Sequence, residues 1–202
     1  KTAYEIMPSL VGSEMCIRDR GIADYAKLMK IPCVGGKVSF YNETNDGPIK
    51  PTPLIGVLGL IEKSPLLPTS PTKDDVILLV GETKDELGGS EYYEYIYDFI
   101  GGAPPKVNIN ASKRNMNSVL SLISKKLVMN VHDCSKGGLS VALSEMCISG
   151  NIGCRINLNT VSHLSPEKSL FSESHSRYIL VVKNKNLNSV KDLLSKILCY
   201  FS

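Results

Sequence analysis

From residue 74 onward, short apolar runs alternate with longer segments in which apolar residues recur at helical spacing. The runs VILLV, LVMNV and YILVV are rich in aliphatic residues and are bounded by polar residues or glycine, as buried strands are. GCRINL predicts one further short strand. Helical spacing is found in residues 90–100, 118–126, 137–150 and 187–201. Strands that alternate with helices indicate an α/β fold, or an α+β sandwich, built in layers.

The first stretch of the chain lies outside this pattern. Residues 1–5 and 9–19 match the translation of two constant blocks of a sequencing-library adapter, and residues 7–8 hold the place of the variable index between them. The stretch has no continuous apolar run and carries scattered acids, unlike a signal or transit peptide. We therefore expect residues 1–20 to be an adapter artefact and leave them out of the fold argument. The alternative is a short globular lead-in segment.

A linker divides the remaining chain. Residues 66–73 combine two prolines with three hydroxyl residues. Before the linker, residues 21–30 have helical spacing, KVSFYNET predicts a strand that runs into a polar turn, and residues 54–61 predict a buried strand. We expect the tail of one domain at residues 21–65 and a second domain at residues 74–202.

Composition excludes several classes of protein. The net charge of +3, without a basic tract, argues against nucleic acid as a partner. No apolar run approaches the roughly 18 residues of a membrane span, so a membrane partner is not expected. The six cysteines form no CxxC pair, and the three histidines lack ligand spacing, so neither a disulfide framework nor a zinc site is predicted. Reduced thiols in a cytoplasmic protein are the simplest account.

The stretch NVHDCSKGGLSVALSEM predicts a strand, a turn and a helix. Ser135 is placed as an N-cap, and Gly137 and Gly138 open the helix, where unpaired N–H groups suit a phosphate. Ser135, Gly137 and Gly138 are therefore a possible phosphate loop. The alternative is that the two glycines allow close packing of helix and sheet.

Two other stretches carry polar groups suited to ligands. The strand after Gly36 ends in hydroxyl, amide and carboxylate groups, which suit Mg²⁺ or a phosphorylated substrate, although they could also make only turn hydrogen bonds. In LFSESHSR, Arg177 and its serines could bind an anion. The alternative there is a surface ion pair between Glu173 and Arg177. The serines in question are Ser172, Ser174 and Ser176.

Taken together, GGKVSFYNET, PIKPTPLIGVLGLIE, LGGSEYY, HDCSKGGLSVALSEM and LFSESHSR resemble the large, synthetase subunits of phosphoribosylformylglycinamidine synthases. Their order and spacing agree over nearly all of residues 21–182. Aminoimidazole ribonucleotide synthase, selenophosphate synthetase and thiamine-phosphate kinase share the architecture, but VSFYNE with HDCSKGGL and LFSES points away from them. Another ATP-using enzyme of that superfamily remains an alternative.

The resemblance implies a PurM-like (AIR synthase-related) C-terminal domain preceded by the tail of a PurM-like N-terminal domain. It implies a cytoplasmic C–N ligase of purine biosynthesis that uses ATP and Mg²⁺ to convert formylglycinamide ribonucleotide and ammonia to the amidine. A glutaminase subunit or domain would supply the ammonia, and the rest of the synthetase chain would complete the site. The catalytic residues would lie upstream, so the fragment alone is expected to be inactive. A non-catalytic, nucleotide-holding half is the other possibility.

The resemblance also implies roles for three neighbouring residues. Gly36 matches a glycine that contacts the nucleotide, and Ser39 matches a serine that contacts the substrate. Lys37 stands where the family commonly has an asparagine that binds Mg²⁺. A charged lysine has donors and no lone pair, so metal coordination by Lys37 is not expected; its ammonium could face phosphate instead.

Overall fold

The computed structural model describes residues 13–37, 43–45, 47–48, 53–61, 67 and 71–197. The chain divides into two compact units, Lys1–Glu62 and Lys63–Ser202. Among the described helices, none is long and apolar enough to cross a membrane.

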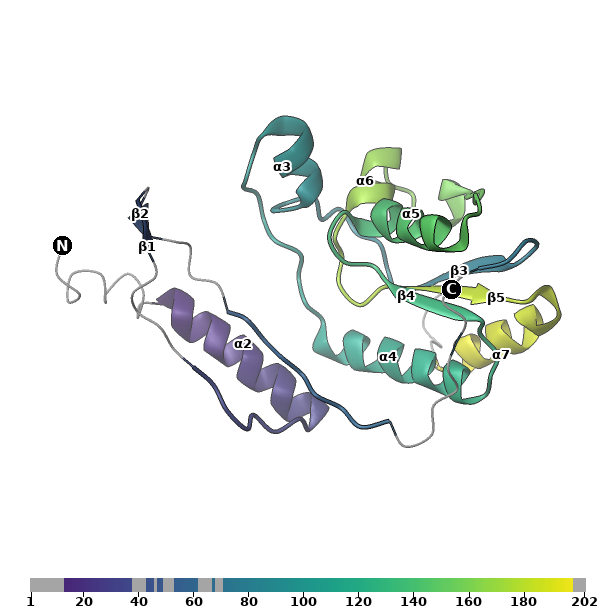
Figure 1. Ribbon diagram of the computed structural model, residues 1–202, viewed down its shortest axis with the longest axis horizontal. Helices are drawn as coiled ribbons and strands as arrows, with labels where there is room; N and C mark the ends of the chain where they lie inside the picture. Colours follow the sequence, from purple (N-terminus) through teal and green to yellow (C-terminus); the bar gives the residue numbers. More distant parts are fainter. Residues whose placement is uncertain are drawn as a thin grey trace. The chain divides into compact units, whose positions relative to one another are not determined.

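In the first unit, helix α2 (Ser13–Met29) confirms the helix predicted for residues 21–30 and begins before that stretch (Figure 1). Strands β1 (Glu43–Thr44) and β2 (Gly47–Pro48) form a small antiparallel pair. The predicted strand at residues 38–40 lies outside the described residues.

Two predicted strands are not formed. Residues 53–61 contain no strand, and Leu54, Leu58 and Leu60 are 97–99% exposed, so the prediction of a buried strand there is wrong. Residues 153–157 are irregular and lead into a 3₁₀ turn, η1 (Leu158–Thr160). A short apolar run becomes a strand only when another strand pairs with it, and neither segment has such a partner among the described residues.

The second unit is built on a three-stranded antiparallel sheet with the order β3-β5-β4. The strands are β3 (Val76–Val80), β4 (Asn130–Asp133) and β5 (Tyr178–Val182), as the apolar runs predicted. Leu180 of β5 lies opposite Leu78 on one side and Val131 on the other. The last strand of the chain is therefore the central one, and its last four residues are at most 1% exposed.

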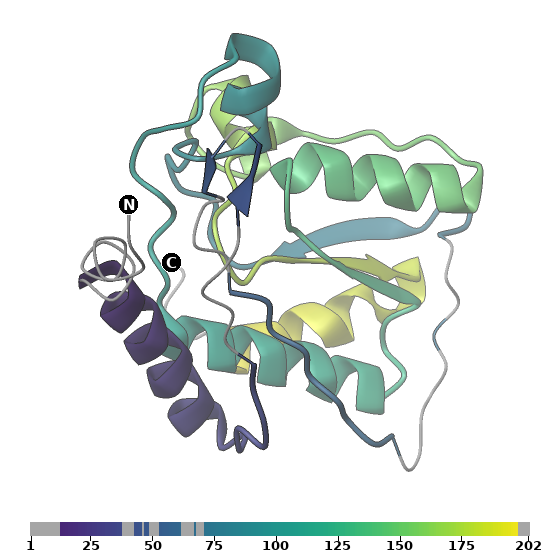
Figure 2. The ribbon, with the colours of Figure 1, turned by 60° about the vertical axis from the view of Figure 1, so that its left-hand side comes forward.

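Helices cover both faces of this sheet (Figure 2). On one face, Leu180 and Val182 pack with Leu122 of α4 (Ile109–Ser124) and Val190 of α7 (Leu187–Ile197). Side chains alternate across a strand, so Leu180 and Val182 share a face.

On the opposite face, Ile179 and Val181 pack with Leu139 and Met146 of α5 (Gly138–Gly150). Helix α6 (Pro166–Phe171) contacts α5. The second unit is thus a layered α/β sandwich, which confirms the predicted fold class.

The remaining helix of this unit is α3 (Glu91–Tyr97), which follows β3. The Ser90 hydroxyl accepts a hydrogen bond from the amide of Tyr93 at 3.3 Å, so Ser90 is the N-cap of this helix. A short 3₁₀ helix, η2 (Asn184–Asn186), connects β5 to α7.

Candidate functional site

The nucleotide and substrate residues expected from the resemblance belong to the first unit. Gly36 and Lys37 are exposed in an irregular segment, and a side chain at Gly36 would meet nothing within 4 Å. Ser39 lies outside the described residues. Their roles in binding nucleotide, substrate or metal stay predictions.

In the second unit, the turn between β4 and α5 is shaped by glycine. Gly137 is the N-cap of α5, with a left-handed φ of 72°, and no side chain caps the helix. Ser135 is exposed, and its carbonyl accepts a hydrogen bond from the amide of Gly138 at 3.1 Å. The N-cap is Gly137, so the prediction that Ser135 is the N-cap is wrong. The backbone at the N-cap is left-handed, a conformation that glycine adopts without strain.

Close packing explains Gly138. A Cβ atom at this position would lie 2.5 Å from the carbonyl oxygen of Ser172 and 2.8 Å from that of Leu170. The start of α5 thus approaches the backbone at the end of α6 so closely that only glycine fits. This contact supports the packing interpretation of the glycine, with α6 and its following loop as the neighbour instead of the sheet.

Glu173 occupies the position at which an anion was predicted. One carboxylate oxygen, Oε1, accepts hydrogen bonds from the amide of Gly137 at 2.8 Å and from the amide of Glu91 at 2.9 Å. The Glu173 side chain thereby joins the starts of α5 and α3, where the helix dipoles favour negative charge. A phosphate at the Gly137 amide would have to displace this carboxylate.

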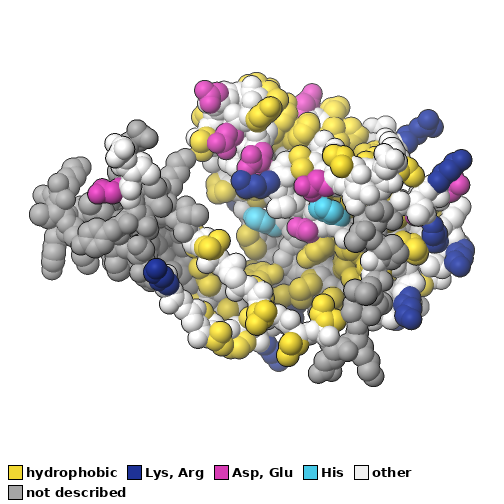
Figure 3. Space-filling view, in the orientation of Figure 1, with side chains coloured by type: hydrophobic (Ala, Val, Ile, Leu, Met, Phe, Trp, Pro, Cys, Tyr) yellow, Lys and Arg dark blue, Asp and Glu magenta, His cyan; other side chains and the backbone are white. Residues whose placement is uncertain are grey.

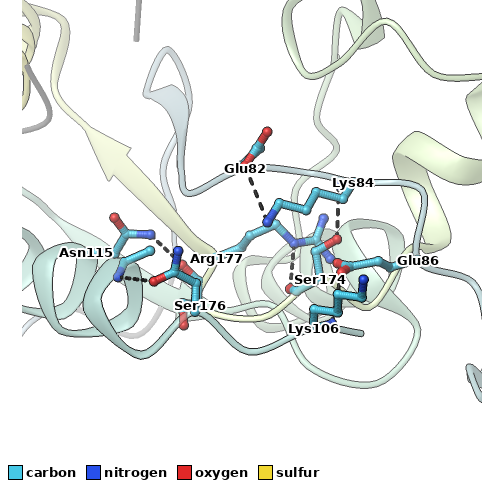
Figure 4. Close-up of polar contacts among 10 residues, drawn as sticks. Glu82, Lys84, Glu86, Lys106, Asn115, Ser174, Ser176 and Arg177 are labelled. Carbon is cyan, nitrogen blue, oxygen red and sulfur yellow. Dashed lines mark hydrogen bonds and ion pairs between the residues drawn. The ribbon is translucent and has the colours of Figure 1, made fainter. Parts of the chain in front are cut away.

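Arg177 is fully buried and holds its own loop in place (Figure 4). Its Nε donates to the carbonyl of Ser174 at 3.0 Å, one terminal nitrogen donates to the Thr83 hydroxyl at 3.0 Å, and the other donates to the carbonyl of Ser172. Burial lowers the pKa of Arg177, although the nearby charges of Cys134, Glu86 and Glu173 oppose that shift.

This geometry corrects both interpretations of Arg177. A guanidinium with 0% exposure is not open to an anion from solution. The carboxylate of Glu173 bonds to backbone amides, so the predicted surface ion pair with Arg177 is not formed either.

The serines of the 172–177 loop bind neighbouring protein groups. The hydroxyl of Ser172 accepts from the amide of Glu86 at 3.3 Å, and that of Ser174 accepts from the amide of Lys84 at 3.0 Å. These bonds tie the loop to the connection between β3 and α3.

On its other side, the 172–177 loop is tied to α4 (Figure 4). The hydroxyls of Ser176 and Ser112 share a hydrogen bond, and the Asn115 side-chain amide donates to the carbonyl of Ser176 at 3.0 Å. Gly81, with φ of 100°, would place a Cβ 2.6 Å from that same carbonyl oxygen. The loop is therefore a structural junction between β3, α3, α4 and α5.

Acidic, basic and histidine side chains lie close together on one face of the second unit (Figure 3). The ammonium of Lys136 lies 2.5 Å from the Glu91 carboxylate, and the His132 Nε2 lies 3.2 Å from the Glu145 carboxylate. Cys134, beside the junction, donates its amide to the carbonyl of Arg177 at 3.0 Å. Burial raises the pKa of the Cys134 thiol to about 11, as expected of a packed rather than a reactive thiol.

The three-stranded sheet covered by helices on both faces defines an α/β domain of a recognisable class. The profile of the AIR synthase related protein C-terminal domain matches residues 72–200, and the chain belongs to this family. The predicted resemblance is thereby confirmed for the second unit.

Among individual proteins, this chain is similar in sequence to PurL proteins. The chain is 43% identical over 174 residues to the phosphoribosylformylglycinamidine synthase subunit PurL of Pyrococcus horikoshii, covering 86% of this chain and 24% of that protein. It is 44% identical over 182 residues to PurL of Thermococcus sibiricus, covering 88% of this chain and 25% of that protein. The chain thus spans about a quarter of the length of the curated relatives it matches.

Solved structures agree on the fold. The chain superimposes on Thermotoga maritima PurL complexed with FGAR with a TM-score of 0.57 and 22% identity, over 64% of this chain and 23% of that one. A second structure of the T. maritima synthase gives a TM-score of 0.52 at 22% identity, over 64% of this chain and 21% of that one.

Proposed function

We propose that this chain is a C-terminal part of a phosphoribosylformylglycinamidine synthase, the ATP-dependent ligase that converts formylglycinamide ribonucleotide and ammonia to the amidine. The observation that carries the proposal is identity of 43–44% to PurL proteins over 86–88% of this chain. The family match of the second unit supports the same assignment.

Within that enzyme, the chain contributes the C-terminal domain matched by residues 72–200 and the end of the preceding N-terminal domain. Gly36 contacts ATP and Ser39 contacts the ribonucleotide, in keeping with T. maritima PurL, which is solved with FGAR and with ADP. The remaining three quarters of the synthetase supply the other ligands, and a glutaminase subunit or domain supplies ammonia.

Magnesium does not fit the position at which the family binds it. Lys37 is an exposed cation there, and an ammonium has no lone pair for a metal. Its charge suits a phosphate oxygen instead. If the Lys37 ammonium faces a phosphate oxygen, Lys37→Asn in the complete enzyme changes the Mg²⁺ dependence of turnover. An unchanged dependence counts against this role of Lys37.

The isolated chain is inactive in this proposal, because it lacks most of the site. The decisive experiment replaces the matching quarter of the P. horikoshii protein with this chain. With ammonia supplied, we expect the chimera to release ADP only when the ribonucleotide is present, and the isolated chain to release none. Turnover by the isolated chain, or a folded chimera without turnover, would overturn the proposal.

The second candidate function is a structural half that holds the enzyme together without serving the working site. It is favoured by the 172–177 loop and the start of α5, whose polar groups bond to one another. Ser39→Ala in the chimera separates the two functions: a raised KM for the ribonucleotide supports a role at the working site. Unchanged kcat and KM support the structural role.

The phosphate loop is tested in the same chimera. Ser135→Ala, at an exposed position, removes one hydroxyl without touching the internal bonds of the turn. A raised KM for ATP supports Ser135 as a phosphate ligand. Unchanged kinetics rule out the Ser135 hydroxyl as a phosphate ligand.

A further inference from the structure

A cavity of about 510 Å³ lies in the second unit, on the face of the sheet that α5 covers. Its walls come from residues 71–77, from the buried side of α5, and from residues 152–155. Pockets that hold small molecules have volumes of roughly 300–1,000 Å³. The cavity is therefore of the size that a small ligand needs.

The base of this cavity is apolar. Ile77 of β3 and Val181 of β5 lie opposite each other in the sheet, and both line the cavity. From α5 come Leu143, Met146 and Cys147, which share one face of the helix because they are three and four positions apart. A ligand seated there meets aliphatic and sulfur groups, which suit an apolar body.

The wall formed by residues 71–75 is held in place by contacts of its own. A Cβ atom at Gly150, the last residue of α5, would lie 3.0 Å from Cδ of Pro71, so the two segments touch. The amide and hydroxyl of Thr72 donate to Oδ2 of Asp75 at 2.9 and 2.8 Å. The Lys183 ammonium lies 2.7 Å from Oδ1 of the same carboxylate. Asp75 lines the cavity, but its charge is thus already neutralised within the wall.

Two cations of the lining remain uncompensated. Lys73 and Arg155 line the cavity and are exposed, and no carboxylate of the described residues forms an ion pair with either. Asp74 also lines the cavity and is exposed, so two cations stand against one free carboxylate. Because a guanidinium binds a carboxylate through two parallel hydrogen bonds, Arg155 suits an anionic group.

We propose that this cavity binds a small molecule that carries an anionic group on an apolar body. The anionic group faces Arg155 and Lys73, and the body lies against the apolar base. The inference goes beyond the proposed ligase function and is independent of it, because none of the residues that line the cavity has a role in the proposed reaction.

The first test measures binding of octanoate to the full chain by isothermal titration calorimetry. We expect saturable binding, and roughly tenfold weaker binding of hexanoate, which has two methylene groups fewer to bury. Acetate supplies the anionic group without the body, and 1-octanol supplies the body without the charge. Both should bind more weakly than octanoate, and equal affinity for octanoate and 1-octanol would contradict an anion site.

The second test locates the bound molecule. Cys147 and Cys154 line the cavity, whereas the exposed Cys33 belongs to the first unit. Octanoate at about ten times its Kd should slow alkylation of the two cavity thiols by iodoacetamide on the order of tenfold, as followed by mass spectrometry. Alkylation of Cys33 should be unchanged. Equal slowing at all three thiols, or none at the two in the cavity, would place the octanoate elsewhere and overturn the proposal.

Charge variants complete the test. The double variant Lys73→Gln, Arg155→Gln should bind octanoate on the order of tenfold more weakly and 1-octanol as before, because hydrogen bonds to a charged group are lost. Lys191→Gln is the matched control, since Lys191 is exposed on α7, which covers the opposite face of the sheet. No saturable binding of octanoate to the unchanged chain, or equal affinity of the double variant and the control, overturns the proposal.

Discussion

The Oε1 atom of Glu173 lies 2.8 Å from the amide nitrogen of Gly137 and accepts its hydrogen. The same oxygen accepts the amide of Glu91, so one carboxylate joins the beginnings of two helices. An ionised acceptor at helix starts makes stronger hydrogen bonds than a neutral one.

Removing this carboxylate should destabilise the second unit. We expect Glu173→Ala to lower the free energy of unfolding by about 1–3 kcal/mol, because two amides lose their acceptor. Glu173→Gln, which keeps an acceptor oxygen, should cost less. Urea denaturation measures both, with Glu82→Gln as the control, since Glu82 is 59% exposed at its side chain and pairs only at the surface with Lys84. Equal effects of Glu173→Ala and Glu82→Gln would refute the role of Glu173.

Arg177 should not tolerate lysine. Arg177→Lys keeps the positive charge but loses the planar fork that reaches Thr83 and the loop carbonyls, so we expect a loss of about 2–4 kcal/mol in unfolding free energy. Arg155→Lys, at an exposed position, should change stability by less than about 0.5 kcal/mol. Thermal and urea unfolding of both variants check the difference; a stable Arg177→Lys protein is incompatible with the bonds described.

Gly81 should be required for close approach of two backbone segments. Gly81→Ala would set a Cβ 2.6 Å from the Ser176 carbonyl oxygen on a residue with φ of 100°. We expect a loss of about 2 kcal/mol or more. Gly153→Ala is the matched control, because its Cβ would meet nothing within 4 Å, and it should be nearly neutral. If the two alanine variants unfold at the same urea concentration, the close approach at Gly81 is wrong.

Cys134 should make stability depend on alkaline pH. Burial raises the pKa of this thiol in the folded protein to about 11 from its ordinary value of 9.0. The protonated form is favoured by folding, so this contribution is complete below about pH 9 and is lost as the pH rises through about 11. A shift of that size corresponds to about 2–3 kcal/mol.

Unfolding free energies of the unchanged chain and of Cys134→Ala, measured across this pH range, isolate the contribution of one thiol. Both chains carry the other groups that titrate at alkaline pH, so the difference between the two curves reports Cys134 alone. We expect this difference to shrink as the pH rises, because the contribution of the protonated thiol is lost. Parallel curves would mean that Cys134 is not shielded from water. In the same range, alkylation of Cys134 should lag behind that of the exposed Cys33.

Local sequence determined much of the second unit. Three aliphatic runs specified β3, β4 and β5, because residues of this kind with polar boundaries suit buried strands. Ser90 caps the start of α3 through a hydrogen bond from Tyr93, which is only three positions further along the chain. The ordered motifs, compared as a set, identified the family that the profile match confirms.

Contacts between distant residues were decided only by the tertiary structure. Glu173 bonds to Glu91 and Gly137, and Arg177 bonds to Thr83. These pairs are too far apart in the sequence for helical or strand periodicity to relate them. Because these bonds occupy the groups that were expected to bind an anion, the 172–177 loop is a structural junction. A pattern reports which groups are present, whereas only the fold reports which of them are already bonded.

The strands show the same limit. Residues 54–61 are as apolar as β5, yet Leu58 is 98% exposed while Leu180 is fully buried. The difference lies in the neighbours, since Leu180 has a strand on each side and residues 54–61 have none among the described parts of the chain. The sequence by itself determined which segments can be strands; pairing, which is a property of the whole fold, decided which of them are.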